Sequence, residues 1–163
     1  MIGHRAELLA KLLLTRRMNV DVIRFDEGGE MGIDYLCSIR SEKVPGFMLF
    51  GVLVWGTSDD LSTEAAVVRH VRTRRKKLDE HSRYFFPVIA LLCSMRDDRA
   101  YYSWLAEPCE ETGQLVHVVA PVFQEFDVKE LDRVTKRVTK WYQKLATTLV
   151  VDSTELSHCP DDE

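Results

Sequence analysis

The chain has 163 residues, of which 45% are hydrophobic and 29% charged, and its formal net charge is −4. These values are typical of one globular domain with one hydrophobic core rather than two. The leucine-rich start is interrupted by Glu7, Lys11 and Arg16, so it is too short and too charged to cross a membrane, and no small-residue cleavage site follows it. We therefore expect a cytoplasmic protein with no membrane partner.

The charged residues are unevenly spread along the chain. Residues 69–77 contain six of the 22 lysines and arginines, whereas residues 152–163 contain five acids and no lysine or arginine. The overall charge therefore neither supports nor excludes a nucleic-acid partner, and the location of the cations has to decide. The four cysteines are scattered without a C-x-x-C pair, so their spacing gives no zinc signature.

The first part of the chain predicts one helix followed by three strands. Apolar residues recur at helical spacing through residues 2–17, and the repeating positions are Leu8, Leu9, Leu12 and Leu13. Strands are predicted at 20–25, 33–40 and 47–57, because β-branched residues or alternating polarity mark each segment and turn residues separate them.

The middle of the chain predicts a second helix and three more strands. Capping residues open a helix over roughly 62–82, and its inner stripe is predicted to be Leu61, Ala65, Val68, Val71 and Leu78. Residues 87–95 are nearly all apolar, as in a central strand that is buried on both faces. Residues 100–108 follow across a polar turn as the second arm of a hairpin, and a short strand is predicted at 114–123.

The last helix is the clearest predicted element. Asp127 is its expected N-cap, and apolar residues recur at steps of three and four as far as Leu149. Its other side is basic, with Lys129, Arg133, Lys136, Arg137, Lys140 and Lys144. The order α-β-β-β-α-β-β-β-α predicts one α/β layered domain over residues 1–151, followed by an acidic tail, 152–163, that we expect to be disordered.

Four stretches carry a resemblance to a known superfamily. They are Glu7 in the first helix, GID at 32–34, the strand FMLFGVLVWGT at 47–57, and PVIALLCSMRDDRAYYSWL from residue 87. With the order of elements, they resemble the PD-(D/E)XK superfamily, and within it a group of uncharacterised bacterial domains whose third strand reads f-x-v-Q-x-K-g-t. The resemblance covers roughly residues 5–106 and implies a restriction-endonuclease-like mixed central sheet flanked by helices.

The resemblance also implies an active site, from which this sequence departs. Asp34 occupies the position of the motif aspartate, Leu53 that of the Glu or Gln, and Trp55 that of the lysine. In such a site the oxygen ligands hold Mg²⁺ and the lysine orients or activates the attacking water. Strand periodicity places residues 53 and 55 on one face, but leucine offers no oxygen and tryptophan only an N–H donor.

The vestigial positions are therefore Glu7, Asp34, Leu53 and Trp55, and we assign no catalytic residue among them. We expect no cofactor; if a cation binds at all, Asp34 is its ligand. The alternative is a Mg²⁺-dependent DNA or RNA nuclease with a displaced catalytic lysine, for which Lys43, Lys76 and Lys77 are the candidates.

The middle helix offers a candidate nucleic-acid surface. Its cations Arg69, Arg72, Arg75 and Lys76 share one broad flank and could contact phosphates. The competing interpretation is a solvated helix end, in which cations complement the helix dipole.

Three hypotheses about function follow. The first is a catalytically inactive PD-(D/E)XK-like domain that acts as a binding module for nucleic acid or protein. The second is the nuclease with a displaced lysine, and the third is a structural domain or one that forms homo-oligomers. An exposed Trp55 would favour partner binding at the old cleft, whereas a buried Trp55 would favour a structural role.

Overall fold

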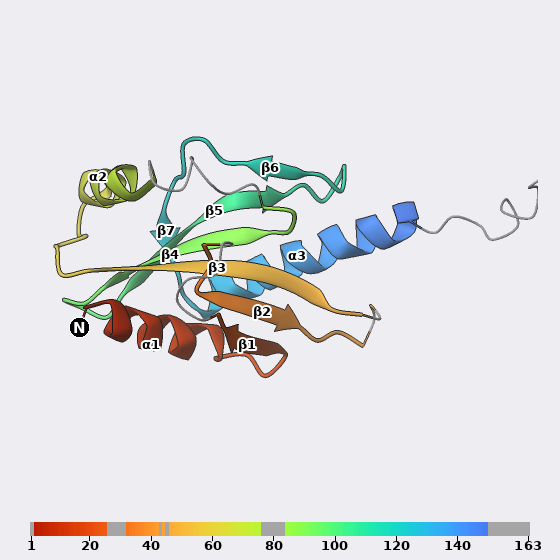
Figure 1. Ribbon diagram of the computed structural model, residues 1–163, viewed down its shortest axis with the longest axis horizontal. Coiled ribbons are helices and arrows are strands. Elements are labelled where there is room, and N and C mark those ends of the chain that lie inside the picture. Colours follow the sequence, from red (N-terminus) through yellow and green to blue (C-terminus); the bar gives the residue numbers. More distant parts are fainter. Residues whose placement is uncertain (1, 26–31, 43, 45, 76–83, 150–163) are drawn as a thin grey trace, which may run out of the picture.

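The computed structural model describes residues 2–25, 32–42, 44, 46–75 and 84–149, without the side chains of 71, 73–75 and 149 (Figure 1). It confirms an α/β fold, with a seven-stranded mixed sheet and three helices in the described part. The helices are α1 (Ile2–Leu14), α2 (Glu64–Arg75) and α3 (Val128–Leu149). The strands are β1 (Val20–Arg24), β2 (Tyr35–Ile39), β3 (Met48–Thr57), β4 (Val88–Ser94), β5 (Ala100–Pro108), β6 (Leu115–His117) and β7 (Gln124–Glu125).

The sheet has the order β1-β2-β3-β4-β5-β6, and β7 also pairs with β5. Strands β1, β2 and β3 form an antiparallel meander, β3 and β4 are parallel, and β4, β5 and β6 are again antiparallel. The parallel pair requires a crossover connection, and this connection contains α2. All seven residues of β4 are buried, as its continuous apolar sequence predicted.

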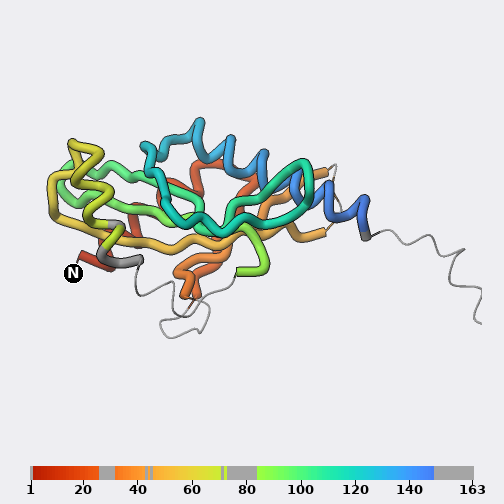
Figure 2. Tube along the Cα trace, turned by 90° about the horizontal axis from the view of Figure 1, so that it is seen from above, coloured from red at the N-terminus to blue at the C-terminus, as the bar shows by residue number. Residues whose placement is uncertain are grey.

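Each face of the sheet has its own apolar cluster. Alternate residues of β3, among them Phe50 and Val52, point to the face that α1 and α3 cover, and we call this the two-helix face. The residues between them, including Leu53 and Trp55, point to the opposite face, which we call the Trp55 face. Figure 2 shows α3 lying along one side of the sheet, with α2 near one end. The fold therefore buries β3 on both faces.

Helix α1 packs on the sheet through a side that differs from the predicted stripe. Leu8 and Leu12 are 56% and 59% exposed, whereas the buried residues are Ala6, Ala10, Leu13 and Leu14. The physical reason is a close approach of α1 to β3 at Gly56. A Cβ at Gly56 would lie 2.7 Å from the Cβ of Ala6, so only small side chains fit between the helix and the strand.

The second helix also differs from its prediction. Leu61 is buried as expected, but among the described side chains of α2 Val67 is the buried one, and the predicted inner residues Ala65 and Val68 are exposed. The buried side of the described helix is thus displaced from the predicted stripe. The side chain of Val71 and the whole of Leu78, which complete that stripe, lie outside what the structure describes.

The predicted strand at 114–123 is divided in the structure. Only Leu115–His117 forms β6. The amide of Val118 still donates a hydrogen bond to the carbonyl of Leu105 on β5, and the chain then turns away from β5. Beyond Val118 the chain forms no strand until Gln124. The chain returns to β5 as β7, which the sequence did not predict. The predicted acidic tail, 152–163, lies outside the described residues.

Helix α3 begins as predicted, because the Asp127 carboxylate accepts a hydrogen bond from the amide of Glu130 at 2.8 Å. Leu131, Val134, Val138 and Trp141 are buried and anchor α3 to the two-helix face. None of the described helices is long and apolar enough to cross a bilayer.

Candidate functional site

The two positions that replace the motif residues on β3 are part of the core. The side chains of Leu53 and Trp55 are in the apolar cluster of the Trp55 face, and the residues are only 9% and 7% exposed. Their register partners on β4, Ala90 and Leu92, are fully buried. The ring of Trp55 also lies 6.4 Å from that of Phe123, centroid to centroid. The described members of this cluster are all hydrophobic side chains, with no carboxylate among them.

Asp34 performs a main-chain role at the start of β2. Its amide donates a hydrogen bond to the carbonyl of Val52, which is the register partner of Tyr35, the first residue of β2. The register between β2 and β3 ends at that pair. Beyond it, the Asp34 carboxylate accepts a hydrogen bond from the amide of Val54 at 2.6 Å, where a continued ladder would offer a main-chain carbonyl.

Glu7 lies on the two-helix face and pairs with a cation from the edge strand. Its carboxylate is 2.8 Å from the guanidinium of Arg24, and its side chain is 17% exposed. Tyr35 donates a hydrogen bond from its hydroxyl to the Glu7 carbonyl at 3.0 Å. Burial raises the pKa of Tyr35, the charges of Glu7 and Asp34 raise it further, and Arg24 opposes them.

The structure thus surrounds Tyr35 with Glu7, Arg24 and Asp34, but it does not build a metal site from them. Among the described residues, no group of three or more His, Cys, Asp or Glu side chains could hold a metal ion. Arg24 was missed by the sequence analysis. Its signal was present, because strand alternation puts Arg24 on the same face as the inward-pointing Val20 and Val22.

The predicted nucleic-acid residues of α2 are only partly described. Arg69 and Arg72 lie on exposed positions of α2. The side chain of Arg75 is not described, and Lys76 lies beyond the described part of the helix. The candidates for a displaced lysine, Lys43, Lys76 and Lys77, also fall outside the described residues.

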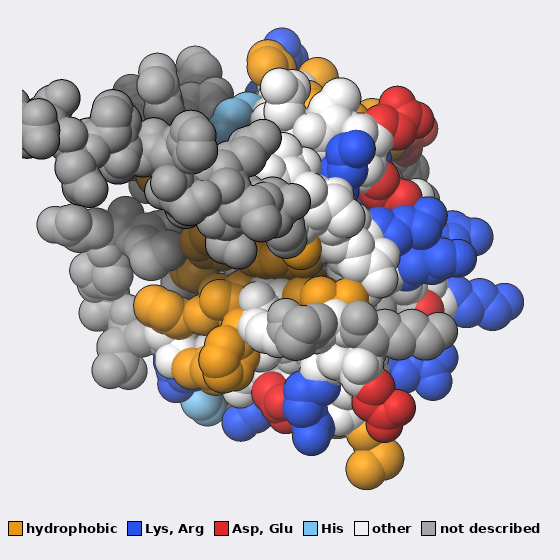
Figure 3. All heavy atoms as spheres, turned by 90° about the vertical axis from the view of Figure 1, so that its right-hand side faces the viewer, with side chains coloured by type: hydrophobic (Ala, Val, Ile, Leu, Met, Phe, Trp, Pro, Cys, Tyr) orange, Lys and Arg blue, Asp and Glu red, His pale blue; other side chains and the backbone are white. Residues whose placement is uncertain are grey.

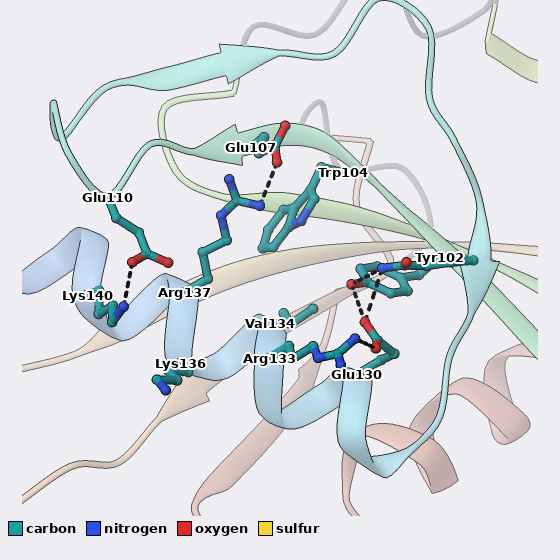
Figure 4. A pocket seen from close by; sticks show the side chains of 11 residues that line it. Tyr102, Trp104, Glu107, Glu110, Glu130, Arg133, Val134, Lys136, Arg137 and Lys140 are labelled. Carbon is teal, nitrogen blue, oxygen red and sulfur yellow. Dashed lines mark hydrogen bonds and ion pairs between the residues drawn. The ribbon is translucent and has the colours of Figure 1, made fainter.

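A groove of about 500 Å³ runs between α3 and the β5–β7 region of the sheet (Figure 4). Trp104 lies in it, and the guanidinium of Arg137 stands 5.8 Å from the Trp104 ring centroid. Arg137 is bound at 2.6 Å by Glu107, and Lys140 at 2.8 Å by Glu110. The close-up view shows these pairs bridging from α3 to the strand and the turn that follows it.

The inner end of the groove is a hydrogen-bonded network around Glu130. Its carboxylate accepts from the Tyr102 hydroxyl at 2.9 Å and from the amide nitrogen of Gln124 at 3.1 Å, and it pairs with Arg133. Gln124 also donates to the Tyr102 oxygen at 2.6 Å. Burial, followed by the Glu130 carboxylate, raises the pKa of Tyr102 to about 12, so this phenol is a poor acid or nucleophile at neutral pH. The network fastens α3 to the sheet.

The outer side of α3 carries a row of exposed cations that we call the α3 row. Its members are Lys129, Arg133, Lys136, Lys140 and Lys144. Successive members are three or four residues apart, so they share one side of the helix, opposite the buried apolar residues. Figure 3 shows Lys and Arg side chains gathered on the side of the molecule where α3 lies. Among the described residues, only Arg133 and Lys140 of this row form ion pairs.

Comparisons with models of protein families, with curated proteins and with solved structures gave no match to this chain in any of the three.

Proposed function

We propose that this chain is a catalytically inactive domain of the PD-(D/E)XK type that acts as a binding module. The observation that carries the proposal is the burial of Leu53 and Trp55 in an apolar cluster, where a nuclease of this type needs a metal ligand and a lysine. The helix, three-stranded meander, crossover helix and parallel strand support the restriction-endonuclease-like arrangement.

The other two vestigial residues, Asp34 and Glu7, each have a partner within the protein. Neither carboxylate therefore needs a metal ion to offset the cost of its burial. The Asp34 carboxylate accepts a main-chain hydrogen bond from Val54, and Glu7 is neutralised by Arg24. A carboxylate that is half-buried without a partner would be costly, and each of these two has one. Trp55 is buried, the outcome that favours the structural hypothesis for the old cleft, so the old cleft offers no surface for a partner. A binding module therefore needs a binding surface elsewhere on the chain.

For that surface we propose the α3 row, with the phosphate backbone of nucleic acid as its ligand. Five cations at successive turns of one helix form a linear array, and Lys129, Lys136 and Lys144 have no acidic partner among the described residues. Such arrays bind phosphates by displacing counterions, and this binding weakens steeply with salt. The acids Glu110 and Glu130 beside the row reduce its field, so we expect modest affinity.

The first experiment tests catalysis. Single- and double-stranded DNA and RNA are incubated with the full chain and Mg²⁺ or Mn²⁺, and we expect no cleavage. Cleavage that Asp34→Ala abolishes would overturn the proposal and establish the nuclease alternative, with a displaced lysine. Cleavage that survives Asp34→Ala would indicate a contaminating nuclease, which repurification of the chain removes.

The second experiment tests binding by fluorescence anisotropy with labelled DNA and RNA across a range of salt concentrations. In the double variant K136E/K144E we expect at least about tenfold weaker binding at low salt and, for single strands, a log–log salt slope that is smaller by about 1.4. The matched control is K11E/R16E, which makes the same change in net charge on exposed residues of the α1 end. A third variant, R69E/R72E, tests α2. Equal losses in all three variants, or no binding at low salt, would exclude the α3 row.

A further inference from the structure

The strand β6 forms one edge of the sheet, and its outer side pairs with no described strand (Figure 1). The amide of Val118 bonds to the carbonyl of Leu105, and the amide of Cys109 bonds to the carbonyl of Gln114. Hydrogen-bonded pairs alternate along an antiparallel ladder, so Val116 directs its main-chain groups inward to Glu107. The N–H and C=O groups of Leu115 and His117 therefore point outward from the sheet.

This edge is apolar and lacks charged protection. Residues 115–123 contain no acid, lysine or arginine. Val116, Val119 and Val122 are 52%, 85% and 72% exposed. Soluble domains normally guard an open edge with charged side chains, because an unguarded edge pairs with other strands. Several exposed apolar side chains within one short segment also indicate an interaction surface.

The opposite edge of the same sheet has that protection. On β1, Arg24 pairs with Glu7 and Asp21 pairs with Arg40. Charged side chains thus stand along β1, although its Ile23 is 54% exposed, very close to the value for Val116. Each edge strand thus exposes an apolar residue to about the same extent, and the two edges differ in their charged side chains. The absence of charge from residues 115–123 is therefore the feature that distinguishes the β6 edge.

We infer that β6 is a homodimer interface, in which the edge strands of two copies of this chain pair antiparallel across a two-fold axis. The outward groups of Leu115 in one copy meet those of His117 in the other, and Val116 faces its own counterpart at the axis. This is a non-hydrogen-bonded pair, the type in which opposite side chains lie closest. The inference goes beyond the proposed function and is independent of it.

A second copy fits this edge better than a charged partner does. An uncharged strand can pair with itself without placing like charges opposite each other, whereas an acidic or basic segment would find no counter-charge on residues 115–123. Two nearby acids are paired within the chain, Glu107 with Arg137 and Glu110 with Lys140. Glu111, in the turn before β6, is exposed and has no ion pair among the described residues, so it is the one nearby acid that opposes the approach of a second copy. Val119 and Val122 extend the apolar contact beyond the strands.

The oligomeric state of the full chain tests this inference by sedimentation velocity and light scattering between about 1 and about 100 μM, a range that covers micromolar dissociation constants. We expect a dimer at the upper end of the range. Val116→Lys places two cations opposite each other at the axis, so the dissociation constant should rise at least about tenfold while circular dichroism stays unchanged.

The matched control is Ile23→Lys, which introduces the same lysine on the other edge at a position of nearly equal exposure. It should leave the dimer intact. A wild-type monomer throughout the range would overturn the inference. So would a dimer that resists Val116→Lys, or one that Ile23→Lys disrupts instead.

A disulfide-trapping measurement fixes the register and does not depend on the lysine variants. The chain carries Cys109→Ser and Cys159→Ser, and Val116→Cys is added to it. Across a two-fold axis at this residue, the Cα atoms are about 4.5 Å apart, within the range that a disulfide bridges. We expect a crosslinked dimer under mild oxidation, and none from Ile23→Cys in the same background. Equal crosslinking of both variants would mean random collision and would contradict the register.

Discussion

In the part of the chain that the structure describes, one face of the sheet is covered by two helices, and the other largely by side chains of the sheet and its loops. On the two-helix face, α1 and α3 supply the apolar contacts. Ion pairs such as Arg137–Glu107 also join α3 to the sheet. On the Trp55 face, α2 contributes Val67, and Trp55 packs with Leu61, Tyr84 and Phe123. On the described part of this face, Trp55, a large side chain of the sheet itself, therefore supplies part of the apolar cover that α1 and α3 supply on the other face.

The largest expected effect follows from emptying that position. Trp55→Ala should lower the free energy of unfolding by about 3–5 kcal/mol, because a buried indole leaves a large cavity. Urea unfolding followed by circular dichroism measures it. The control is Phe47→Ala, whose ring is 84% exposed, and its effect should stay within about 0.5 kcal/mol. Equal, small effects of the two variants would mean that Trp55 is a surface anchor and that the two faces are not built as described.

The next effect concerns Asp34, which lies just before β2 and accepts a hydrogen bond from Val54 on β3. Asp34→Ala leaves the Val54 amide without its acceptor and should cost about 1–3 kcal/mol of unfolding free energy. Asp34→Asn keeps a side-chain oxygen and should cost less. Unfolding midpoints with and without about 10 mM Mg²⁺ should coincide for the wild type, since a ligand that binds only the folded chain would raise them. A Mg²⁺-dependent rise that disappears in Asp34→Ala would restore the metal-site interpretation.

Alkaline pH should destabilise the two-helix face through its thiols. Burial raises the pKa of Cys93 to about 12, and it raises that of Cys37 as well. Above pH 9, the usual range of a thiol in the unfolded chain, the folded chain keeps protons that the unfolded chain loses. Stability is therefore fully present below about pH 9 and falls as pH rises toward 12, with a slope of up to about 1.4 kcal/mol per pH unit for each thiol.

Unfolding free energies measured between about pH 8 and about pH 11 give this slope, and Cys93→Ala should make it shallower. Cys109→Ala is the control. That thiol is only half-buried, and a hydrogen bond with the Thr112 side chain lowers its pKa. Above about pH 9 it is deprotonated in both the folded and the unfolded chain, so its removal should leave the slope above that pH unchanged. Identical slopes for wild type and Cys93→Ala would show that the alkaline response comes from other groups.

The smallest effect concerns the start of α3 on the two-helix face. Asp127→Ala removes the N-cap and should cost about 1 kcal/mol, measured by thermal or urea unfolding. Asp127→Asn retains a capping oxygen and should be nearly neutral. If both variants destabilise equally, the negative charge at the helix N-terminus matters more than the hydrogen bond.

Local patterns in the sequence were sufficient for most of the fold. The periodicity and cap of α3, the apolar run of β4 and the shared face of Leu53 and Trp55 all follow from spacings of two to four residues, and the structure agrees with them. Whether the face of Trp55 is covered depends on Leu61 and Phe123, which come from separate segments. Periodicity within β3 holds no information about them.

The failures have the same origin. The exposed side of α1 was mistaken for the inner side because large leucines were expected against the sheet, whereas Gly56 admits only small residues such as Ala6 there. The assignment of Asp34 and Glu7 as vestigial positions is not one of these failures and stays a prediction, because it rests on the resemblance alone. Their main-chain and ion-pair partners, the Val54 amide and Arg24, became visible only when separate segments were brought together.

The hydrogen bond from Val54 to Asp34 has a consequence for how sequences of this kind are interpreted. Because the Asp34 carboxylate stands where a main-chain acceptor would, replacing it carries a folding cost whatever the chemistry of the site. An aspartate at this position is therefore not by itself a sign of a reaction, since a purely architectural need accounts for it equally well. The two positions on the next strand, Leu53 and Trp55 here, carry the information about chemistry that Asp34 alone does not.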